Sequence, residues 1–193
     1  MVTECFKRTL EILEKSLYSI CPNEFNSLVE DCINTLDKGK KIITSGLGKN
    51  VPICEKFVGT LNSVGIPATF MNTNSAFHGD LGVVLKGDLV IILSKSGETI
   101  ESIYLTQQLK KRDCKIWLLS FNRDSSLCRE TPKSLILSLS HEGDEWNMLP
   151  NNSTLLNLLV LQELAMQIIR KKSITIDALR QNHPGGAIGE KLR

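Results

Sequence analysis

The stretch that decides the fold reads Asp88-Leu89-Val90-Ile91-Ile92-Leu93 and continues as Ser94-Lys95-Ser96-Gly97-Glu98-Thr99. The apolar run 89–93, bounded by polar turn residues, indicates a buried strand in the middle of a parallel sheet. The polar run predicts a turn into a helix over residues 99–112. Backbone N–H groups and the helix dipole at such a turn favour an anion, above all phosphate. We therefore expect a phosphorylated small molecule to bind at the carboxyl edge of an α/β sheet.

The rest of the chain repeats this alternation of strand and helix. Further strands are expected at residues 41–45, 68–72, 115–119 and 134–139, and further helices at residues 3–20, 23–38, from the turn 46–49 to about 63, and 152–170. This order predicts an α/β fold with a doubly wound, five-stranded, mainly parallel sheet flanked by helices. The leucines of helix 152–170 point to more than one side, so we expect a second helix or a second subunit to cover it. Residues 1–193 are expected to form one domain.

Composition narrows the function classes. Hydrophobic residues make up 41% of the 193 residues, and the formal net charge is only +2, which does not favour a nucleic-acid partner. The six cysteines form no C-x-x-C pair and no zinc-ligand spacing, so free thiols in a reducing cytosol are expected. Neither a signal peptide nor an apolar run of about 18 residues is evident. We expect a cytoplasmic protein without a membrane partner.

Two polar loops follow the first two expected strands. The first contains Gly46-Leu47-Gly48-Lys49 before Asn50, and its glycines allow a ligand to approach the backbone closely. Lys49 could neutralise a phosphate or polarise a substrate oxygen. The loop is neither a P-loop nor a full G-x-G-x-x-G pattern, so no nucleotide is implied, and an ordinary turn is the alternative. The second loop carries His78, whose imidazole is either an acid–base group or a structural residue.

The third loop, residues 94–99, gives the strongest signal for an anion site. Its hydroxyl donors are Ser94, Ser96 and Thr99. Two acids follow at the start of the helix, and Glu98 and Glu101 share a face because they are three residues apart. The alternative role for both acids is compensation of the helix dipole.

Two further segments carry candidate residues. Residues 140–154 combine three acids, among them Glu142, with a polar turn, and one carboxylate could be a general base. Asn152 or Ser153 is expected to cap the helix that follows, and a solvated loop is the alternative for the segment. Near the other end, His183 precedes Pro184, which keeps it out of the helical region. Its ring could enter a pocket, or the segment could be a tail without a role.

Together these loops resemble a sugar isomerase (SIS) domain and, more narrowly, arabinose 5-phosphate isomerases. The resemblance rests on four segments: Gly46-Leu47-Gly48-Lys49, Phe77-His78-Gly79-Asp80-Leu81-Gly82, Ser94-Lys95-Ser96-Gly97-Glu98 and His183-Pro184-Gly185-Gly186-Ala187-Ile188-Gly189. The serine loop is general to the superfamily, whereas the two histidine segments are more specific to this branch. The resemblance implies a five-stranded SIS fold, a homotetramer with sites shared between subunits, and a catalytic domain without the pair of cystathionine-β-synthase-type domains that many members carry.

The resemblance also implies roles for individual residues. The catalytic set would be Lys49, Glu101, Glu142 and His183, with His78 as a further site residue. The phosphate would be held by Ser94, Ser96 and Thr99, by the loop Gly48–Asn50, and by Ser153 and Thr154. Two departures concern the phosphate side. Asn50-Val51-Pro52 replaces the usual Ser-Gly-His, and Lys95 replaces a usual asparagine, adding a positive charge that either tightens binding or points to solvent.

The implied reaction interconverts D-ribulose 5-phosphate and D-arabinose 5-phosphate through an enediol and supplies Kdo biosynthesis. It requires a base and a donor to the oxygens but no redox cofactor and no metal. Glu142 is the first choice for the base and Glu101 the second, Lys49 would stabilise the enediolate, and His183 of a neighbouring subunit would shuttle a proton between oxygens. Two alternatives are an SIS isomerase of another ketose phosphate and a sugar-phosphate-binding regulator without turnover.

Overall fold

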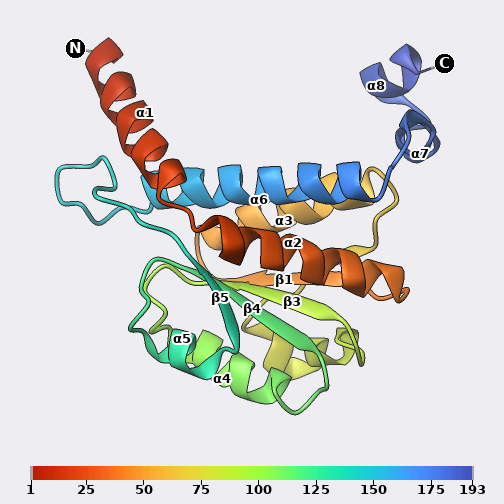
Figure 1. The fold of residues 1–193 in the computed structure, drawn as a ribbon, viewed down its shortest axis with the longest axis horizontal. Coiled ribbons are helices and arrows are strands. Elements are labelled where there is room, and N and C mark those ends of the chain that lie inside the picture. Colours follow the sequence, from red (N-terminus) through yellow and green to blue (C-terminus); the bar gives the residue numbers. More distant parts are fainter. Residues whose placement is uncertain (1, 193) are drawn as a thin grey trace.

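The computed structural model describes residues 2–192 and contains one fully parallel five-stranded sheet (Figure 1). The strands are β1 (Ile42–Gly46), β2 (Ala68–Phe70), β3 (Leu89–Leu93), β4 (Lys115–Ser120) and β5 (Lys133–Ile136), in the order β2-β1-β3-β4-β5. The predicted five-stranded parallel sheet is confirmed. The edge strands β2 and β5 end earlier than predicted, at residues 70 and 136 rather than 72 and 139.

Helices cover both faces of the sheet, as a doubly wound fold requires (Figure 1). One face carries α1 (Val2–Tyr18), α2 (Pro22–Asp37), α3 (Asn50–Asn62) and α6 (Asn152–Lys171), and the other carries α4 (Ile100–Leu109) and α5 (Ser126–Glu130). Among residues 2–192, no helix is both long enough and apolar enough to cross a bilayer.

The two faces hold separate hydrophobic cores, and β3 supplies side chains to both. Leu89, Ile91 and Leu93 belong to the core under α2, α3 and α6, whereas Val90 and Ile92 belong to the core over α4. All five residues are at most 1% exposed, because successive side chains of a strand point to opposite faces and both faces are covered. The central strand therefore holds the following loop, residues 94–99, on a rigid base.

α6 packs against α1, α2 and α3, yet part of its apolar surface stays open. Leu156, Leu161 and Leu164 are buried, whereas Leu155 and Leu159 are each 42% exposed. The chain's own helices thus cover one part of the leucine surface. That a second subunit covers the rest stays a prediction.

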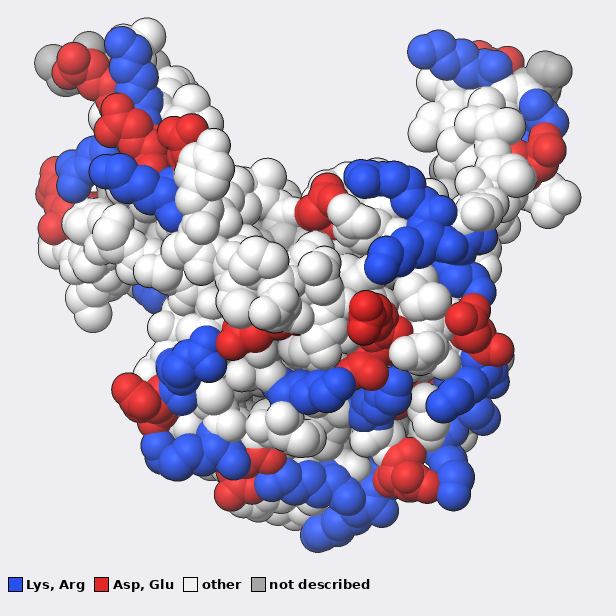
Figure 2. Space-filling model, viewed as in Figure 1, with Lys and Arg blue, Asp and Glu red and all other residues white. Residues whose placement is uncertain are grey.

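Two arms project from the same side of the molecule (Figure 1). One is the first half of α1, and the other holds α7 (Ile176–Asn182) and α8 (Gly186–Lys191). Between the arms, the surface next to α1 is largely uncharged, whereas basic and acidic side chains gather toward the arm of α7 and α8 and intermix over the lower part of the molecule (Figure 2). The sequence pattern did not predict α5, α7, α8 or the short 3₁₀ helices at residues 75–78 and 80–83, because elements of four to seven residues carry too little periodicity.

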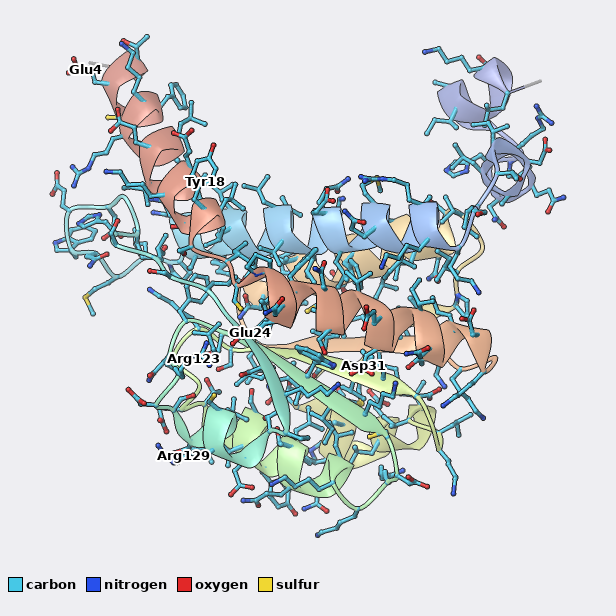
Figure 3. The ribbon with its side chains drawn as sticks, viewed as in Figure 1. Glu4, Tyr18, Glu24, Asp31, Arg123 and Arg129 are labelled. Atoms are coloured by element: carbon cyan, nitrogen blue, oxygen red, sulfur yellow. The ribbon has the colours of Figure 1, made fainter. Side chains whose placement is uncertain are left out.

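A charged cluster fastens α2 to the amino-terminal ends of β4 and β5. Asp31 accepts hydrogen bonds from Lys115 Nζ and Lys133 Nζ, each at 2.8 Å, and from Trp117 Nε1 at 2.9 Å. Lys133 Nζ also lies 5.5 Å from the centre of a Trp117 ring. Burial alone would raise the pKa of Asp31, but these donors outweigh it and lower that pKa to about 2. Figure 3 shows Asp31 on the side of α2 that faces the sheet.

Candidate functional site

The site lies where the strand order reverses. β1 is followed along the chain by its neighbour β2, but β3 lies on its other side, and Gly46 at the end of β1 is paired with Leu93 at the end of β3. The loops that leave these two strands diverge to opposite faces of the sheet. Ligands of open α/β sheets bind in the crevice that such a reversal creates at the carboxyl ends of the strands.

A pocket of about 260 Å³ occupies this crevice. It is lined by Leu47, Asn50, Leu93, Ser94, Lys95, Ser96, Thr99 and Ser102. We call it the loop pocket. Asn50 reaches across it, since its Nδ2 donates to the Leu93 carbonyl at 3.4 Å. The structure thus brings together five of the residues predicted to bind phosphate, and adds Ser102, which the sequence reading had missed.

Two serine hydroxyls stabilise the loop 94–99 by accepting backbone N–H groups, and their own O–H groups remain available to donate to a ligand. Ser94 Oγ accepts the Gly97 N–H at 3.2 Å, and Ser96 Oγ accepts the Glu98 N–H at 3.2 Å. A hydroxyl that accepts still has its own hydrogen to donate, so both serines can donate to an anion. Gly97 has φ +67°, and a Cβ there would lie 2.2 Å from Ser125 Oγ, so the turn requires glycine.

Glu98 in this loop and Glu101 in the helix after it have different surroundings. Glu98 accepts the Ser126 N–H at 2.8 Å, which ties it to the start of α5 and favours a structural role. Glu101 is exposed in the first turn of α4. One turn later, the Tyr104 ring lies 4.8 Å from the Phe77 ring, centre to centre, and Phe77 precedes the exposed His78. The loop of His78 and the face of α4 that carries Glu101 therefore lie side by side.

Glu142 is buried at the beginning of α6 and is only 1% exposed. Its Oε2 accepts the N–H of Asn151 at 3.0 Å and of Ser153 at 2.9 Å. The prediction that Asn152 or Ser153 caps this helix was wrong: the N-cap position is Asn151, and its side chain makes no capping bond. A carboxylate from the preceding loop satisfies the free N–H groups instead and is stabilised by the helix dipole.

Lys95 is the cation that faces Glu142. Its Nζ forms an ion pair with Glu142 Oε1, so the lysine that departs from the family pattern joins the loop pocket to the start of α6. Burial alone would raise the pKa of the Glu142 carboxyl, but Lys95 and Ser153 outweigh it and hold that pKa below its usual value. Glu142 is therefore held in its charged form: Oε2 accepts two backbone N–H groups, whereas the buried Oε1 accepts no hydrogen bond from residues 2–192 and is balanced by the ion pair with Lys95.

A second pocket of about 390 Å³ adjoins the first. It is lined by Lys95, Ser96, Phe121, Asn122, Leu139, His141 and Asn147. We call it the outer pocket. Lys95 and Ser96 line both pockets, so they form the wall between them. Trp146, in the loop before α6, is 68% exposed.

Several predicted residues lie outside the loop pocket. Ser153 is buried and its N–H donates to Glu142, and Thr154 Oγ1 donates to the carbonyls of Pro150 at 3.1 Å and Asn151 at 2.7 Å. These two residues build the start of α6. Gly48, with φ +57°, and Lys49 are exposed in the turn before α3 and do not line the loop pocket.

His183 is not brought to the other site residues within one chain. Glu142 lies at the start of α6, whereas His183 follows α7 beyond its end, and α6 with 20 residues is about 30 Å long. Figure 1 shows α7 and α8 pointing away from the sheet. The His183 backbone, at φ −124° and ψ 70°, is outside the helical region, as the following proline predicts.

Asn157 on α6 is a polar residue that the sequence reading missed. It is 1% exposed, and its Nδ2 donates to Asn50 Oδ1 at 3.1 Å. Its own Oδ1 is buried without a partner. The one signal in the sequence was an asparagine within a leucine-rich helix. Among residues 2–192, no three His, Cys, Asp or Glu side chains gather as metal ligands.

Comparison with known protein families agrees with this geometry. The family pattern of the SIS domain matches this sequence over residues 35–166. These residues include every strand, the loop pocket and Glu142. The chain belongs to the SIS-domain family. The predicted SIS fold is thereby confirmed.

Similar proteins come from several bacteria. The chain is 35% identical over 190 residues to arabinose 5-phosphate isomerase KdsD of Francisella tularensis, covering 98% of this chain and 58% of that protein. It is 34% identical over 183 residues to arabinose 5-phosphate isomerase KpsF of Escherichia coli, covering 95% of this chain and 56% of that protein. The chain thus spans little more than half the length of these relatives.

A solved structure matches along nearly the whole chain. A protein of Escherichia coli CFT073, in complex with arabinose 5-phosphate, superposes with a TM-score of 0.88 at 29% identity and covers 95% of both chains.

Proposed function

We propose that the chain is an aldose–ketose isomerase that interconverts D-ribulose 5-phosphate and D-arabinose 5-phosphate through an enediol. The observation that carries the proposal is the loop pocket at the strand reversal, which is lined by four hydroxyl side chains and by a lysine paired with a buried carboxylate. The names of the KdsD and KpsF relatives and the arabinose 5-phosphate complex of the Escherichia coli protein support this choice of substrate.

The proposed roles divide the site into a phosphate end and a reacting end. Ser94, Ser96 and Thr99 hold the phosphate, and its binding fixes C1 and C2 of the sugar against the acid–base groups. Glu142 moves the proton between C1 and C2, with Glu101 as the second candidate. Isomerisation transfers hydrogen within one molecule, so electrons balance without an external oxidant or reductant.

The remaining catalytic residues act on the oxygens. Lys49 stabilises the negative charge of the enediolate, and His78 orients the sugar. His183 moves a proton between the two oxygens. Because α6 separates His183 from Glu142 in one chain, this role requires a second copy. We therefore include a homotetramer with shared sites in the proposal, supported by the exposed apolar residues Leu155 and Leu159 on α6 and Phe6 and Leu10 on α1.

The product would supply Kdo biosynthesis, for lipopolysaccharide or capsule, in the cytoplasm. The names KdsD and KpsF support the pathway, and the six unpaired cysteines fit a reducing compartment.

Turnover of D-ribulose 5-phosphate in D₂O, followed by NMR, tests the proposal. We expect arabinose 5-phosphate to appear, with deuterium at C2 when exchange of the abstracted proton outpaces its return. If the sugar phosphate binds without turnover, the chain is a sensor and the proposal is wrong. If only other ketose phosphates react, the isomerase class holds and the substrate assignment fails.

Mixing two inactive variants tests the shared site. Glu142→Gln and His183→Ala each lack one group, and mixed assemblies recover sites with both groups if two chains build each site. We expect part of the activity to return on mixing. Inactivity of the mixture, with mixed assemblies verified by native mass spectrometry, would contradict a shared site.

A further inference from the structure

The ion pair between Lys95 and Glu142 joins two unequal partners. Glu142 is held by two backbone N–H groups and is 1% exposed, so its carboxylate is fixed. The Lys95 side chain is 43% exposed and lines both the loop pocket and the outer pocket. A lysine carries a point charge on a flexible four-carbon stem. Of the two partners, Lys95 is therefore the one free to move.

The loop pocket places a competing anion within reach of this lysine. Ser94, Ser96 and Thr99 line the same pocket as Lys95 and are the hydroxyls expected to hold a phosphate. A sugar phosphate carries nearly two negative charges at neutral pH, against one on Glu142. At equal distance and equal dielectric screening, the ammonium is therefore attracted more strongly to the phosphate than to the carboxylate.

Other charged groups near Glu142 are tied to their own loop. His141 Nδ1 accepts the Gly143 N–H at 2.9 Å. Asp144 accepts N–H groups of the loop, from Trp146 at 3.0 Å and from Met148 at 3.1 Å. Lys95 is the cation that the structure pairs with Glu142, so its departure would change the charge balance at that carboxylate most.

We propose that Lys95 is a positioning residue which pairs with Glu142 in the free protein and moves to the phosphate when a sugar phosphate enters the loop pocket. Glu142 then keeps its two N–H partners and its position but loses its cation, so it becomes more basic when a substrate is present. In the free protein the paired carboxylate is a weak base. This inference rests on the proposed function for its consequence in catalysis, but the exchange of partners itself requires only an anion.

Carbon-13 NMR of glutamate side chains tests the exchange without turnover. Sulfate is the probe, because it stays dianionic throughout the titration. The Glu142 signal is assigned by its loss in Glu142→Gln. We expect saturating sulfate to raise the pKa of Glu142 in the wild type by at least about one unit more than in Lys95→Met, where only direct repulsion by the anion remains. Equal shifts in the two proteins would overturn the proposal.

Two variants control this experiment. Lys95→Arg keeps a mobile cation and should retain most of the sulfate-dependent shift, which distinguishes a charge effect from a disturbed fold. Lys133→Met removes a lysine from the Asp31 cluster at the amino-terminal edge and should leave the Glu142 titration unchanged. A loss of the shift in Lys133→Met as well would contradict a specific role for Lys95.

Kinetics link the exchange to the reaction. The pH dependence of kcat/KM reports groups of the free enzyme, and that of kcat reports the substrate complex. We expect the acidic limb of kcat to lie about one pH unit above that of kcat/KM in the wild type, and this separation to shrink in Lys95→Met to the part caused by direct repulsion from the phosphate. Coincident limbs in the wild type would overturn the inference and leave the isomerase intact, whereas absent turnover with a normal NMR shift would reject only the isomerase.

Discussion

Each edge of the sheet holds a carboxylate in an ion pair with lysine, but the two ion pairs have different consequences. At the amino-terminal edge, Asp31 is bound by two lysines and an indole N–H, all of which hold α2 on β4 and β5. At the carboxyl edge, Glu142 is bound by two backbone N–H groups and one half-exposed lysine that lines two pockets. A carboxylate with several fixed partners stabilises the fold, whereas one whose single cation faces a pocket can take part in chemistry.

Replacing Glu142 should give the largest functional effect. Glu142→Gln keeps the size of the side chain and one acceptor oxygen for the helix, but it removes the proposed base. We expect kcat to fall by about 10²–10⁴-fold while the protein stays folded. Circular dichroism and turnover of D-ribulose 5-phosphate measure the two effects. Asp31→Asn is the matched control at the other edge, and activity per folded molecule there should equal that of the wild type. An active Glu142→Gln with an inactive Glu101→Gln would reverse our order of bases.

Two glycines with the same backbone angle sharpen the comparison. Gly97 and Gly39 both have φ +67°, but a Cβ at Gly97 would meet Ser125 Oγ at 2.2 Å, whereas nothing lies within 4 Å at Gly39. Gly97→Ala should cost about 3 kcal/mol of unfolding free energy and weaken sulfate binding, and Gly39→Ala about 1 kcal/mol with binding unchanged. Urea unfolding and sulfate titration check both. Equal losses of unfolding free energy in the two variants would mean that the loop 94–99 accommodates the added Cβ by a small shift, without strain.

Removing the Asp31 charge should weaken the fold in a pH-dependent way. The pKa of Asp31 is about 2 in the folded protein, below its ordinary value of 3.8. The charged carboxylate therefore contributes its full stabilisation at pH values above the unfolded pKa and loses it as the pH falls toward the folded pKa. We expect Asp31→Asn to lose about 2 kcal/mol at pH 7, and this difference from the wild type to shrink as the pH falls from about 5 toward 2. Urea unfolding at several pH values measures it. A difference that is independent of pH would show that lost packing, not charge, is responsible.

The smallest expected effect is at the phosphate end of the site. Ser96→Ala removes a donor to the phosphate and the acceptor of the Glu98 N–H, at the exposed turn of the loop. We expect KM for the sugar phosphate to rise about fivefold to tenfold with little change in kcat. Steady-state kinetics measure both constants, and Ser126→Ala, on the neighbouring α5, is the control. A fall in kcat alone would place Ser96 at the reacting end of the sugar.

The sequence pattern predicted the sheet because its strands are short, apolar and bounded by turn residues. It also predicted five residues of the loop pocket, since loops that follow neighbouring parallel strands end at one edge. It could not predict that Glu142 would cap α6 or pair with Lys95, 47 positions away, because such contacts depend on how the start of α6 is placed beside the loop 94–99 in the folded chain. Nor could it place His183, because α7 is too short to show which way the chain turns after α6.

The placement of the two tryptophans gives each edge of the sheet its own optical reporter. Trp117 is 2% exposed and donates to Asp31, whereas Trp146 is 68% exposed on the loop that leads from Glu142 into α6. A buried indole emits at shorter wavelength and is shielded from collisional quenchers such as iodide, and an exposed one is not. Fluorescence at the blue side of the spectrum therefore follows unfolding of the α2 cluster, and the quenchable red side follows the site loop, within a single unlabelled sample.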